Sequence, residues 1–275
     1  MTGEWFPGHM AKTKRLLTEK KKEIDLALIL LDARAPISSI NQYLNEVFID
    51  KPKIYLLNKT DLADPEITQL WLDYFRETNQ QVLTINAAKG SGLRSVVKAA
   101  ESTVLNSKKK YVNLGLKNIP VRSAIIGIPN VGKSTLLNRI MNKKSAVVQN
   151  KPGLTRNLLW YKVNDHFKIL DTPGMLWPKF ESPETGYKIA LLNSIANYIY
   201  DPEKVVDFLL QTVSQYYPEK SQMYFNNCSS WIQFMEGHDV DDTAKKAEEI
   251  INDFRTLKYG KITLERPEEI INTED

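Results

Sequence analysis

The sequence predicts an α/β fold, a mainly parallel sheet with helices on both faces, followed by a smaller all-helical part. The first observation is that apolar, β-branched runs alternate with amphipathic stretches from residue 25 to residue 171. The second is that strand patterns stop after Trp177, where the remaining periodicity is helical. We therefore expect two domains, residues 1–180 and residues 181–275.

The individual elements follow from the same patterns. Strands are expected at residues 25–36, where the run ends in a loop, and at residues 53–57, 81–85, 121–128 and 166–170. Helices are expected at residues 10–24, 66–78, 93–105, 134–140, 191–199, 202–217 and 241–254. Residues 106–118 lack a clear period and form the expected linker.

Composition excludes several classes of protein. The 275 residues can bury a sizeable core, and 42% apolar and 25% charged residues are ordinary for a globular protein. Cys228 is the single cysteine, which excludes a disulfide framework and a C-x-x-C zinc site. The longest apolar run, residues 26–31, is too short to span a bilayer, and no signal-peptide core precedes it. We expect a cytoplasmic protein with no membrane partner.

Residues 127–135, GIPNVGKST, fit the phosphate-loop pattern G-x-x-x-x-G-K-S. The backbone N–H groups of such a loop cradle phosphates, Lys133 would reach the β and γ oxygens, and Ser134 would hold Mg²⁺. An apolar strand precedes the loop and helical periodicity follows it, which an empty glycine turn does not require. The pattern therefore predicts a nucleotide.

Residues 58–61, NKTD, follow the apolar run at residues 53–57 and carry groups that can read guanine. Open α/β sheets bind ligands at the carboxyl ends of their strands. The Asp61 carboxylate can accept bonds from guanine N1–H and its amino group, whereas adenine would set a lone pair against it. Asn58 and Lys59 would hold neighbouring loops and the base face. Taken alone, the segment is explained equally well by a polar turn.

Residues 171–174, DTPG, also follow an apolar strand. Asp171 would reach Mg²⁺ through water, and the Gly174 N–H would sense the γ-phosphate. Thr155 lies between the phosphate loop and this motif, where a switch threonine would complete the Mg²⁺ shell. The pattern D-x-x-G is common, so its position after a phosphate loop is what makes it informative.

The guanine motif precedes the phosphate loop in this chain, which reverses the order of an ordinary small GTPase. The fold is therefore expected to be a circularly permuted P-loop G domain that binds GTP and Mg²⁺. Asn86, Ala87 and Ala88 replace the Ser-Ala-Lys loop that usually backs guanine, so the lysine is missing, and the Ala87 N–H is expected on guanine O6. The candidate nucleotide-binding residues are Asn58, Lys59, Thr60, Asp61, Asn86, Ala87, Asn130, Val131, Gly132, Lys133, Ser134, Thr135, Asp171 and Gly174, and the candidate metal ligands are Ser134, Thr155 and Asp171.

The net charge of +4 conceals a segregation of charge. Residues 102–164 contain no acid, and residues 236–275 carry twelve acids against six bases. Clustered bases favour a polyanion partner, with RNA rather than DNA expected, over a solvated basic face. The twelve basic residues of the acid-free stretch are Lys108, Lys109, Lys110, Lys117, Arg122, Lys133, Arg139, Lys143, Lys144, Lys151, Arg156 and Lys162.

Six segments in this order resemble the YlqF/RbgA family of circularly permuted GTPases. They are WFPGHMAK at residues 5–12, LDARAP at residues 31–36, NKTD, GIPNVGKST, DTPG, and LWPKFE at residues 176–181. The similarity is dense to about residue 185 and looser beyond it. The resemblance implies a GTP hydrolase in late assembly of the large (50S) ribosomal subunit, which binds the subunit precursor and its ribosomal RNA.

Hydrolysis needs a water held in line with the γ-phosphate, and Met175 occupies the place of the glutamine that does this in Ras-type enzymes. A thioether cannot hold the water, so slow turnover that the ribosomal particle stimulates is expected. The candidate catalytic residues are His9, Lys133 and Thr155. His9 is the candidate for orienting the water, because a Gly-Pro turn would present its imidazole. An N-terminal anchor explains His9 equally well. A K⁺ ion held by Asn130, or the Arg156 cation, would be rivals.

Two other functions stay open at this point. The chain could be a nucleotide-regulated RNA-binding scaffold with incidental turnover, which Met175 favours. It could also be a permuted GTPase that acts on another ribosomal RNA target. Permuted GTPases of the small subunit commonly carry a zinc site or an N-terminal barrel, and the single cysteine and the expected N-terminal helix disfavour both.

Overall fold

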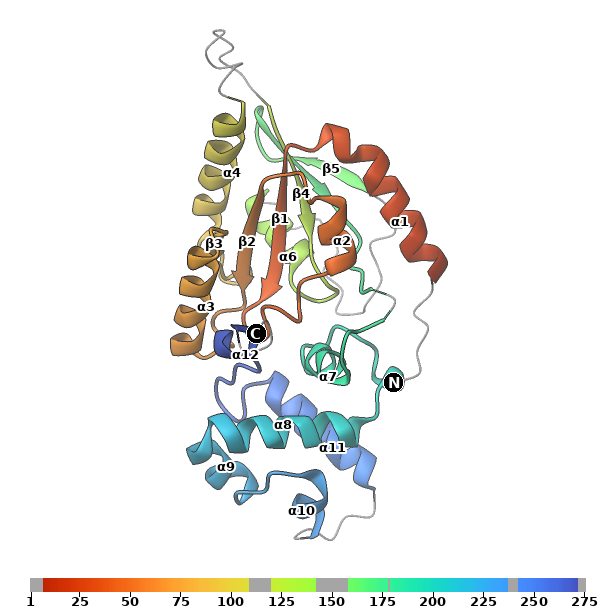
Figure 1. Ribbon diagram of the computed structural model, residues 1–275, viewed down its shortest axis with the longest axis vertical. Coiled ribbons are helices and arrows are strands. Elements are labelled where there is room, and N and C mark those ends of the chain that lie inside the picture. Colours follow the sequence, from red (N-terminus) through yellow and green to blue (C-terminus); the bar gives the residue numbers. More distant parts are fainter. Residues whose placement is uncertain (1–6, 109–119, 142–157, 178, 237–241, 272–275) are drawn as a thin grey trace.

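The computed structural model describes residues 7–108, 120–141, 158–177, 179–236 and 242–271, without the side chains of residues 7–10 and 271. Its centre is a six-stranded sheet in the order β3-β2-β1-β4-β6-β5 (Figure 1). The strands are β1 (Leu26–Asp32), β2 (Lys53–Asn58), β3 (Gln81–Thr84), β4 (Val121–Ile126), β5 (Leu159–Lys162) and β6 (Phe167–Asp171). All neighbours are parallel except β5, which runs antiparallel to β6. The mainly parallel α/β sheet is confirmed.

The central strand β1 lies between the strand that leads into the guanine motif and the strand that leads into the phosphate loop. Its register places Leu30 beside Leu56 of β2 and Ile29 beside Ile126 of β4. All seven residues of β1 are buried, which explains why its sequence is apolar without alternation. Burying each such Leu or Ile contributes about 1.5–3 kcal/mol. The sheet thereby brings two motifs that lie far apart in the chain to one edge.

Helices accompany the strands on both sides of the sheet. In Figure 1, α3 and α4 run along β2 and β3, while α1 and α2 lie on the side of β4 and β5. The start of α3 illustrates how local chemistry sets a boundary, because the Asp64 carboxylate accepts the Glu66 N–H at 2.9 Å and Pro65 follows as first residue. The helices around the sheet are α1 (Pro7–Lys20), α2 (Gln42–Val47), α3 (Pro65–Glu77), α4 (Leu93–Ser107) and α6 (Lys133–Ile140).

The first helix differs from the one expected at residues 10–24. It begins at Pro7, whose fixed φ and missing N–H suit the first helical position, and a 3₁₀ turn (Lys21–Glu23) follows it. The His9 backbone therefore lies in the first turn of α1. The expected Gly-Pro turn at this place was wrong, since the proline starts a helix.

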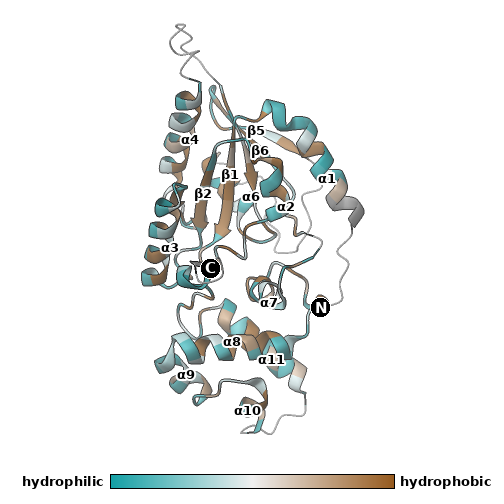
Figure 2. Ribbon diagram, viewed as in Figure 1, coloured by the Kyte–Doolittle hydropathy of each residue, from teal (hydrophilic) through white to brown (hydrophobic). Residues whose placement is uncertain are grey.

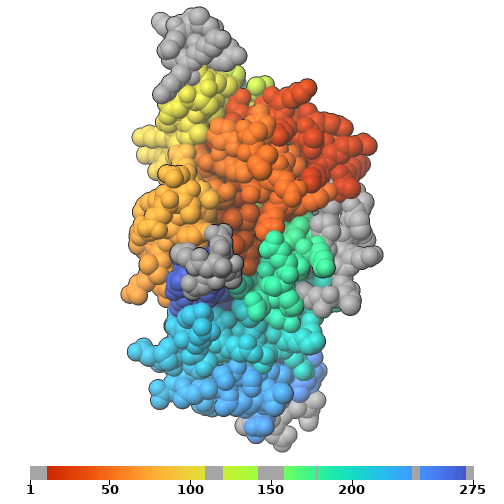
Figure 3. Space-filling view, viewed as in Figure 1, coloured from red at the N-terminus to blue at the C-terminus, as the bar shows by residue number. Residues whose placement is uncertain are grey.

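The chain after β6 is helical in the described residues, as predicted. Figure 1 shows this helical part beyond the carboxyl ends of β1 and β2, and Figure 3 shows its surface lying directly against that of the sheet part. None of the helices in the described ranges is long and apolar enough to cross a membrane. The helices are α7 (Pro183–Leu191), α8 (Pro202–Tyr216), α9 (Pro218–Phe225), α10 (Trp231–Glu236), α11 (Thr243–Arg255) and α12 (Pro267–Ile271).

Amphipathic faces hold the helical part together. The buried residues of α8 include Leu209 and Leu210, and those of α11 include Ile250 and Ile251. The two helices pack on each other, and in Figure 2 their apolar residues alternate with polar ones as the faces turn. The strong 3.6-residue period that predicted both helices is thus the pattern of their burial.

The helix expected at residues 191–199 was wrong. The helix of this region is α7, which starts earlier because the Ser182 hydroxyl caps it, and which ends where Asn193 adopts a left-handed φ of 59°. Only a 3₁₀ turn (Asn197–Ile199) follows. Ile195 is fully buried without being helical, so tertiary packing produced the apolar spacing that suggested a helix.

The segment after α11 returns to the sheet. The Glu265 carboxylate accepts the Ile37 N–H at 2.8 Å, and the Leu264 N–H donates to the Arg34 carbonyl at 2.7 Å. On the sheet side, the donor (Ile37) and the acceptor (Arg34) both belong to the loop after β1. The domain boundary at residue 180 remains a prediction, and these contacts cross it.

Candidate nucleotide-binding site

The predicted phosphate loop is a tight turn between β4 and α6. Gly132 has a φ of 108°, and a Cβ added there would collide with the Asn58 side-chain amide. Asn130 also has a left-handed φ of 56°, a conformation that asparagine tolerates better than most residues. Lys133 begins α6 and is buried, with Nζ donating to two carbonyls at the start of the loop at 2.8 and 2.9 Å. Lys133 thus lies at the centre of the loop.

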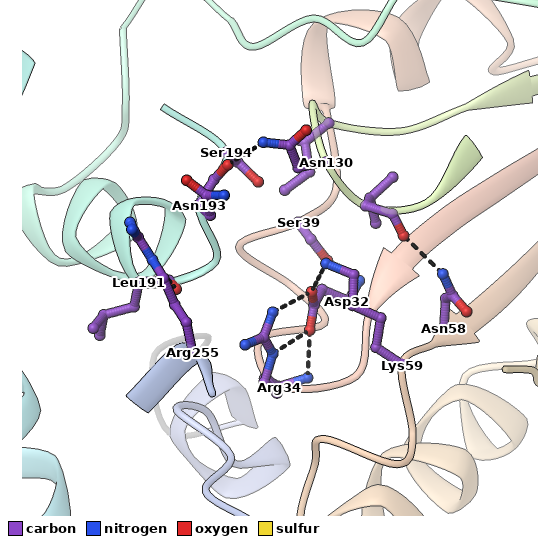
Figure 4. Close-up of polar contacts among 12 residues, drawn as sticks. Asp32, Arg34, Ser39, Asn58, Lys59, Asn130, Leu191, Asn193, Ser194 and Arg255 are labelled. Atoms are coloured by element: carbon purple, nitrogen blue, oxygen red, sulfur yellow. Dashed lines mark hydrogen bonds and ion pairs between the residues drawn. The ribbon is translucent and has the colours of Figure 1, made fainter. Parts of the chain in front are cut away.

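Asn58 joins three loops that come from different parts of the chain. Its Nδ2 donates to the Val131 carbonyl in the phosphate loop at 2.8 Å (Figure 4). Its Oδ1 accepts the Ala87 N–H at 3.0 Å. Asn58 is buried, so both bonds are shielded from water. The structure therefore places Asn58, Val131 and Ala87 together, and the Ala87 N–H expected on guanine is donated to Asn58.

Asp61 lies at the open end of this arrangement. Its side chain is 30% exposed, and the Lys89 Nζ lies 3.7 Å from one carboxylate oxygen. The loop that carries Lys89 is closed by Asn86, whose side chain accepts the Lys89 N–H at 2.8 Å. Thr60 adds a long bond of 3.4 Å to the Ile85 carbonyl. A lysine is therefore present one position after the place where the usual lysine is missing.

Lys59 is held by a pair of residues from the end of β1. Its Nζ lies 2.8 Å from Asp32 Oδ2, and Arg34 makes a two-pronged contact to the same carboxylate at 2.8 and 2.9 Å (Figure 4). Burial alone would raise the Asp32 pKa, but the Arg34 and Lys59 cations outweigh it and hold the pKa well below its usual range. Asp32 is therefore ionised and orients Lys59.

Asp171 lies at the carboxyl end of β6, beside the strand of the phosphate loop. It is buried, and its Oδ1 has no hydrogen-bond partner among the described residues. Burial raises the Asp171 pKa to about 6, although the Lys133 charge opposes that shift. Burial likewise lowers the Lys133 pKa to about 8, against the opposing Asp171 charge. A buried carboxylate oxygen without a partner is what a bound cation would satisfy.

The DTPG segment closes over the phosphate loop. A Cβ at Gly174 would lie 3.0 Å from Lys133 Nζ and 3.0 Å from Pro129 Cα, so glycine allows this close approach. Thr172 anchors the segment by donating to the Ile125 carbonyl at 2.7 Å. The structure therefore brings Gly174, Lys133 and Asp171 into one place.

Met175 packs into the hydrophobic core. Its side chain is 7% exposed and belongs to the hydrophobic core, while its carbonyl accepts the Asn41 amide at 2.6 Å. A buried thioether has no group for holding a water. The residue after the D-x-x-G motif therefore cannot act in hydrolysis here.

Asn130 contacts a segment of the helical part that the sequence patterns did not associate with the site. Its Nδ2 donates to the Asn193 carbonyl at 2.5 Å, and the Ser194 hydroxyl donates to the Pro129 carbonyl at 2.8 Å. Figure 4 shows Asn130 next to Asn193 and Ser194. Neither the turn at Asn193 nor Arg34 was identified from patterns, although polar residues directly after a buried strand were a signal for Asp32 and Arg34.

The side chains of two candidate residues lie outside the part of the chain that the structure describes. Thr155 falls in residues 142–157, which are outside the described residues, and for His9 only the backbone is described. Seven of the twelve basic residues are also outside it: Lys109, Lys110, Lys117, Lys143, Lys144, Lys151 and Arg156. The other five have partners within the protein: Lys108 and Arg122 with Asp25, Lys162 with Asp165, Arg139 with the Ala88 carbonyl, and Lys133 with the phosphate loop.

Comparison with known proteins identifies the family of this chain. A family model described as "50S ribosome-binding GTPase" matches residues 122–230, which include the phosphate loop and the DTPG segment. A protein of Priestia megaterium named ribosome biogenesis GTPase A is 40% identical over 286 residues, covering 98% of both chains. One from Bacillus pumilus with the same name is 38% identical, covering 98% of this chain and 100% of that protein.

A solved structure agrees on the fold. GNP-bound YlqF from T. maritima superposes with a TM-score of 0.64 over 94% of this chain and 99% of its own, at 22% identity. The mainly parallel sheet and the helical C-terminal part are thus a fold common to the two. The named relatives are 40% and 38% identical over 98% of this chain, so the chain belongs to the ribosome biogenesis GTPase A family and is a GTP hydrolase.

Proposed function

We propose that this GTPase binds GTP with Mg²⁺ across the loops at the carboxyl ends of β2, β4 and β6, and acts in late maturation of the large ribosomal subunit. The observation that carries the site is the Asn58 side chain, which joins the guanine motif to Val131 in the phosphate loop and to Ala87. A ligand with both a guanine base and phosphates would contact all three loops at once.

The base end would be read by Asp61 and the loop opposite it. The partly exposed carboxylate can accept the two guanine donors, and Lys89 balances its charge when no base is bound. Because the Ala87 N–H is donated to Asn58, we assign the bond to guanine O6 to the next N–H, that of the exposed Ala88. Lys59 would lie along the base face, oriented by Asp32.

The phosphate end would be held by the loop N–H groups and Lys133. Mg²⁺ fits the donor set at this end, since the buried Asp171 Oδ1 without a partner and the Ser134 hydroxyl are oxygen ligands of the type Mg²⁺ prefers. Thr155 would complete its shell. When bound, Mg²⁺ would supply positive charge to the β and γ oxygens. Gly174, in contact range of Lys133, would sense the γ-phosphate through its N–H.

A group other than Met175 must orient the attacking water. We assign this role to His9, because an imidazole can hold a water or take a proton near neutral pH. A K⁺ ion at Asn130 is the rival: the Asn130 amide donates to Asn193, which leaves its carbonyl oxygen as the group that a cation would bind. The Arg156 cation is a third source of charge.

The proposed partner is the precursor of the large subunit and its ribosomal RNA, which places the protein in the cytoplasm. The family model's description names the 50S ribosome, and the relatives are named for ribosome biogenesis. The acid-free stretch at residues 102–164 supports a polyanionic contact. The buried Met175 favours a second candidate, a nucleotide-regulated RNA-binding scaffold in which turnover is incidental.

A turnover assay with isolated ribosomal particles tests the proposal. GTP hydrolysis is measured for the protein alone, with large subunits and with small subunits, and binding is measured by sedimentation at several salt concentrations. Large subunits should raise turnover, bind more tightly with a non-hydrolysable GTP analogue than with GDP, and dissociate as salt rises. Nucleotide-dependent binding without faster turnover would favour the scaffold. A preference for small subunits would contradict the proposed partner.

A further inference from the structure

The turn that ends α7 lies directly against the phosphate loop. Asn193 takes a left-handed φ of 59°, and the turn is closed by the Ser194 N–H, which donates to the Ile189 carbonyl at 3.1 Å. Its Asn193 carbonyl accepts the Asn130 amide at 2.5 Å, and its Ser194 hydroxyl donates to the Pro129 carbonyl at 2.8 Å. Ser194 is 1% exposed. Two consecutive residues of the helical part thus hold two consecutive residues of the phosphate loop.

Arg255, the last residue of α11, holds that turn from the other side. Its Nη2 donates to the Ala190 carbonyl at 2.6 Å and to the Tyr200 hydroxyl at 3.2 Å, and its Nε donates to the Leu191 carbonyl at 3.4 Å. These carbonyls belong to the last turn of α7, where a cation interacts favourably with the helix dipole. The Ala190 carbonyl also accepts the Asn193 N–H at 2.9 Å. Figure 4 shows Arg255 next to Leu191 and shows Asn193 between Leu191 and Asn130.

Phe254, the residue before Arg255 in α11, is linked to the guanine motif through Arg34 and Asp32. The Arg34 guanidinium lies over the Phe254 ring, 5.6 Å from its centroid. Arg34 is paired with Asp32, and Asp32 is paired with Lys59 of the guanine motif. Phe254 and Arg255 therefore contact residues that lead to both ends of the proposed GTP site, although neither touches it.

We propose that Arg255 is a positioning residue for the phosphate loop, and that the last turn of α11 couples the helical part to the bound nucleotide through the turn at Asn193 and Ser194. This rests on the proposed GTP site. The Asn130 side chain would lie beside the phosphates of a GTP bound at the proposed site. A shift in its position would therefore affect the transition state more than the binding of GTP, which Asp61 and Lys133 would dominate. Because coupling between two sites is reciprocal, a bound nucleotide should in turn steady the α7 turn.

Three variants and one control test the proposal. Arg255→Ala removes the donors to α7. Arg255→Lys restores a cation whose donors all lie on one nitrogen. Ser194→Ala removes the bond to Pro129 with minimal change in volume. Lys246→Ala is the control, because Lys246 is on the same helix and pairs only with Glu249 on the surface, at 3.3 Å, among the described residues. The steady-state kcat and KM for GTP hydrolysis are measured for each, with thermal unfolding to show that each variant folds.

A kcat and KM split is the first readout. Arg255→Ala should lower kcat by about tenfold, since a misplacement near 1 Å at a reacting group can cost up to about 10²-fold, while KM for GTP stays within about threefold. Arg255→Lys should recover most of kcat, Ser194→Ala should lower it in the same direction, and Lys246→Ala should match wild type. If Arg255→Ala does not fold, Ser194→Ala carries the same test.

Hydrogen exchange of residues 192–194 is the second readout, because a merely structural arginine would not link it to nucleotide. In wild type, a non-hydrolysable GTP analogue should slow exchange of these amides, and Arg255→Ala and Ser194→Ala should lose that slowing. Wild-type kcat in both variants, or slowing that persists in them, would overturn the coupling alone. Wild-type protein that neither binds nor hydrolyses GTP would overturn the proposed site as well.

Discussion

Lys59 and Asp32 form an ion pair across two neighbouring strands, with Lys59 Nζ 2.8 Å from Asp32 Oδ2. Lys59 belongs to the guanine motif after β2, whereas Asp32 is the last residue of β1 and is 1% exposed. Arg34 contacts the same carboxylate at 2.8 Å and also lies over Phe254 of the helical part. One buried acid therefore orders the lysine of the proposed nucleotide site and an arginine at the contact between the two parts.

Asp32→Asn should destabilise the protein, because it leaves two cations facing a neutral group. Loss of one partner of a buried pair costs about 3–5 kcal/mol. The folded Asp32 pKa lies below the unfolded value of 3.8, so its stabilisation is present above about pH 4 and is lost as the pH falls below it. Urea unfolding at several pH values should show a smaller acid-induced loss in the variant. Asp165→Asn, which removes an exposed pair with Lys162, should behave as wild type.

Asp61→Asn should weaken the binding of GTP and allow xanthosine triphosphate to bind, because the 2-oxo group of xanthine can accept a hydrogen bond from the amide. Wild type should prefer GTP over ATP by at least about 10²-fold, since a charged acceptor that a bound adenine shields from water and leaves unpaired costs more than about 1–3 kcal/mol. Affinities are measured by titration calorimetry. Asp73→Asn, on the exposed face of α3 where Asp73 pairs with Arg76 at 2.8 Å, is the matched control. Equal wild-type affinities for GTP and ATP would exclude the assigned base contact.

Removal of Mg²⁺ with a chelator should abolish turnover while leaving GDP binding largely intact. Asp171→Ala and Ser134→Ala should each lower turnover at saturating GTP by about 10²-fold or more, because each removes an oxygen from the proposed Mg²⁺ shell. Titration with Mg²⁺ should show a raised half-saturating concentration in both. Ser95→Ala alters an exposed serine of α4 and should change neither value. Full turnover in Asp171→Ala would remove Asp171 from the metal site.

His9→Ala should cut particle-stimulated hydrolysis by about 10²-fold or more, with GTP affinity nearly unchanged. The reason is that the core burial of Met175 leaves the attacking water without a group to orient it. His166→Ala is the matched control, because His166 is exposed in the β5–β6 hairpin. Full stimulated turnover in His9→Ala would make His9 an anchor. Exchange of K⁺ for Na⁺ in the same assay would then show whether an ion at Asn130 takes its place.

Much of the fold was predictable because burial of the central strands leaves a continuous apolar signal. The strands at residues 53–57 and 81–85 and the helices α4, α8 and α11 agree with their predicted ranges within a few residues. The helix expected at residues 191–199 failed, because Ile195 is buried by tertiary packing while Asn193 ends the helix. Local periodicity cannot distinguish these two causes of an apolar position.

For the candidate site, the sequence identified residues but not the contacts between them. Asn58, Gly132, Lys133, Asp171 and Gly174 could be proposed as site residues from the sequence, because a phosphate loop and the motifs around it need particular residue types at particular spacings. The partners of these residues could not be proposed in this way. The Asn58 bond to Ala87, the Lys89 contact with Asp61, and the Asn193 bond to Asn130 each join residues at least 28 positions apart.

By itself, the sequence determined the nucleotide chemistry, the permuted order of the motifs and the mainly parallel sheet, since each of these depends on residue type and short-range spacing. Only the tertiary structure decided that Asp32 orders Lys59, that Met175 is buried in the core, and that Arg255 supports the turn against the phosphate loop. Such contacts depend on how strands and helices are placed in space, and the loops that make them have no periodic pattern along the chain.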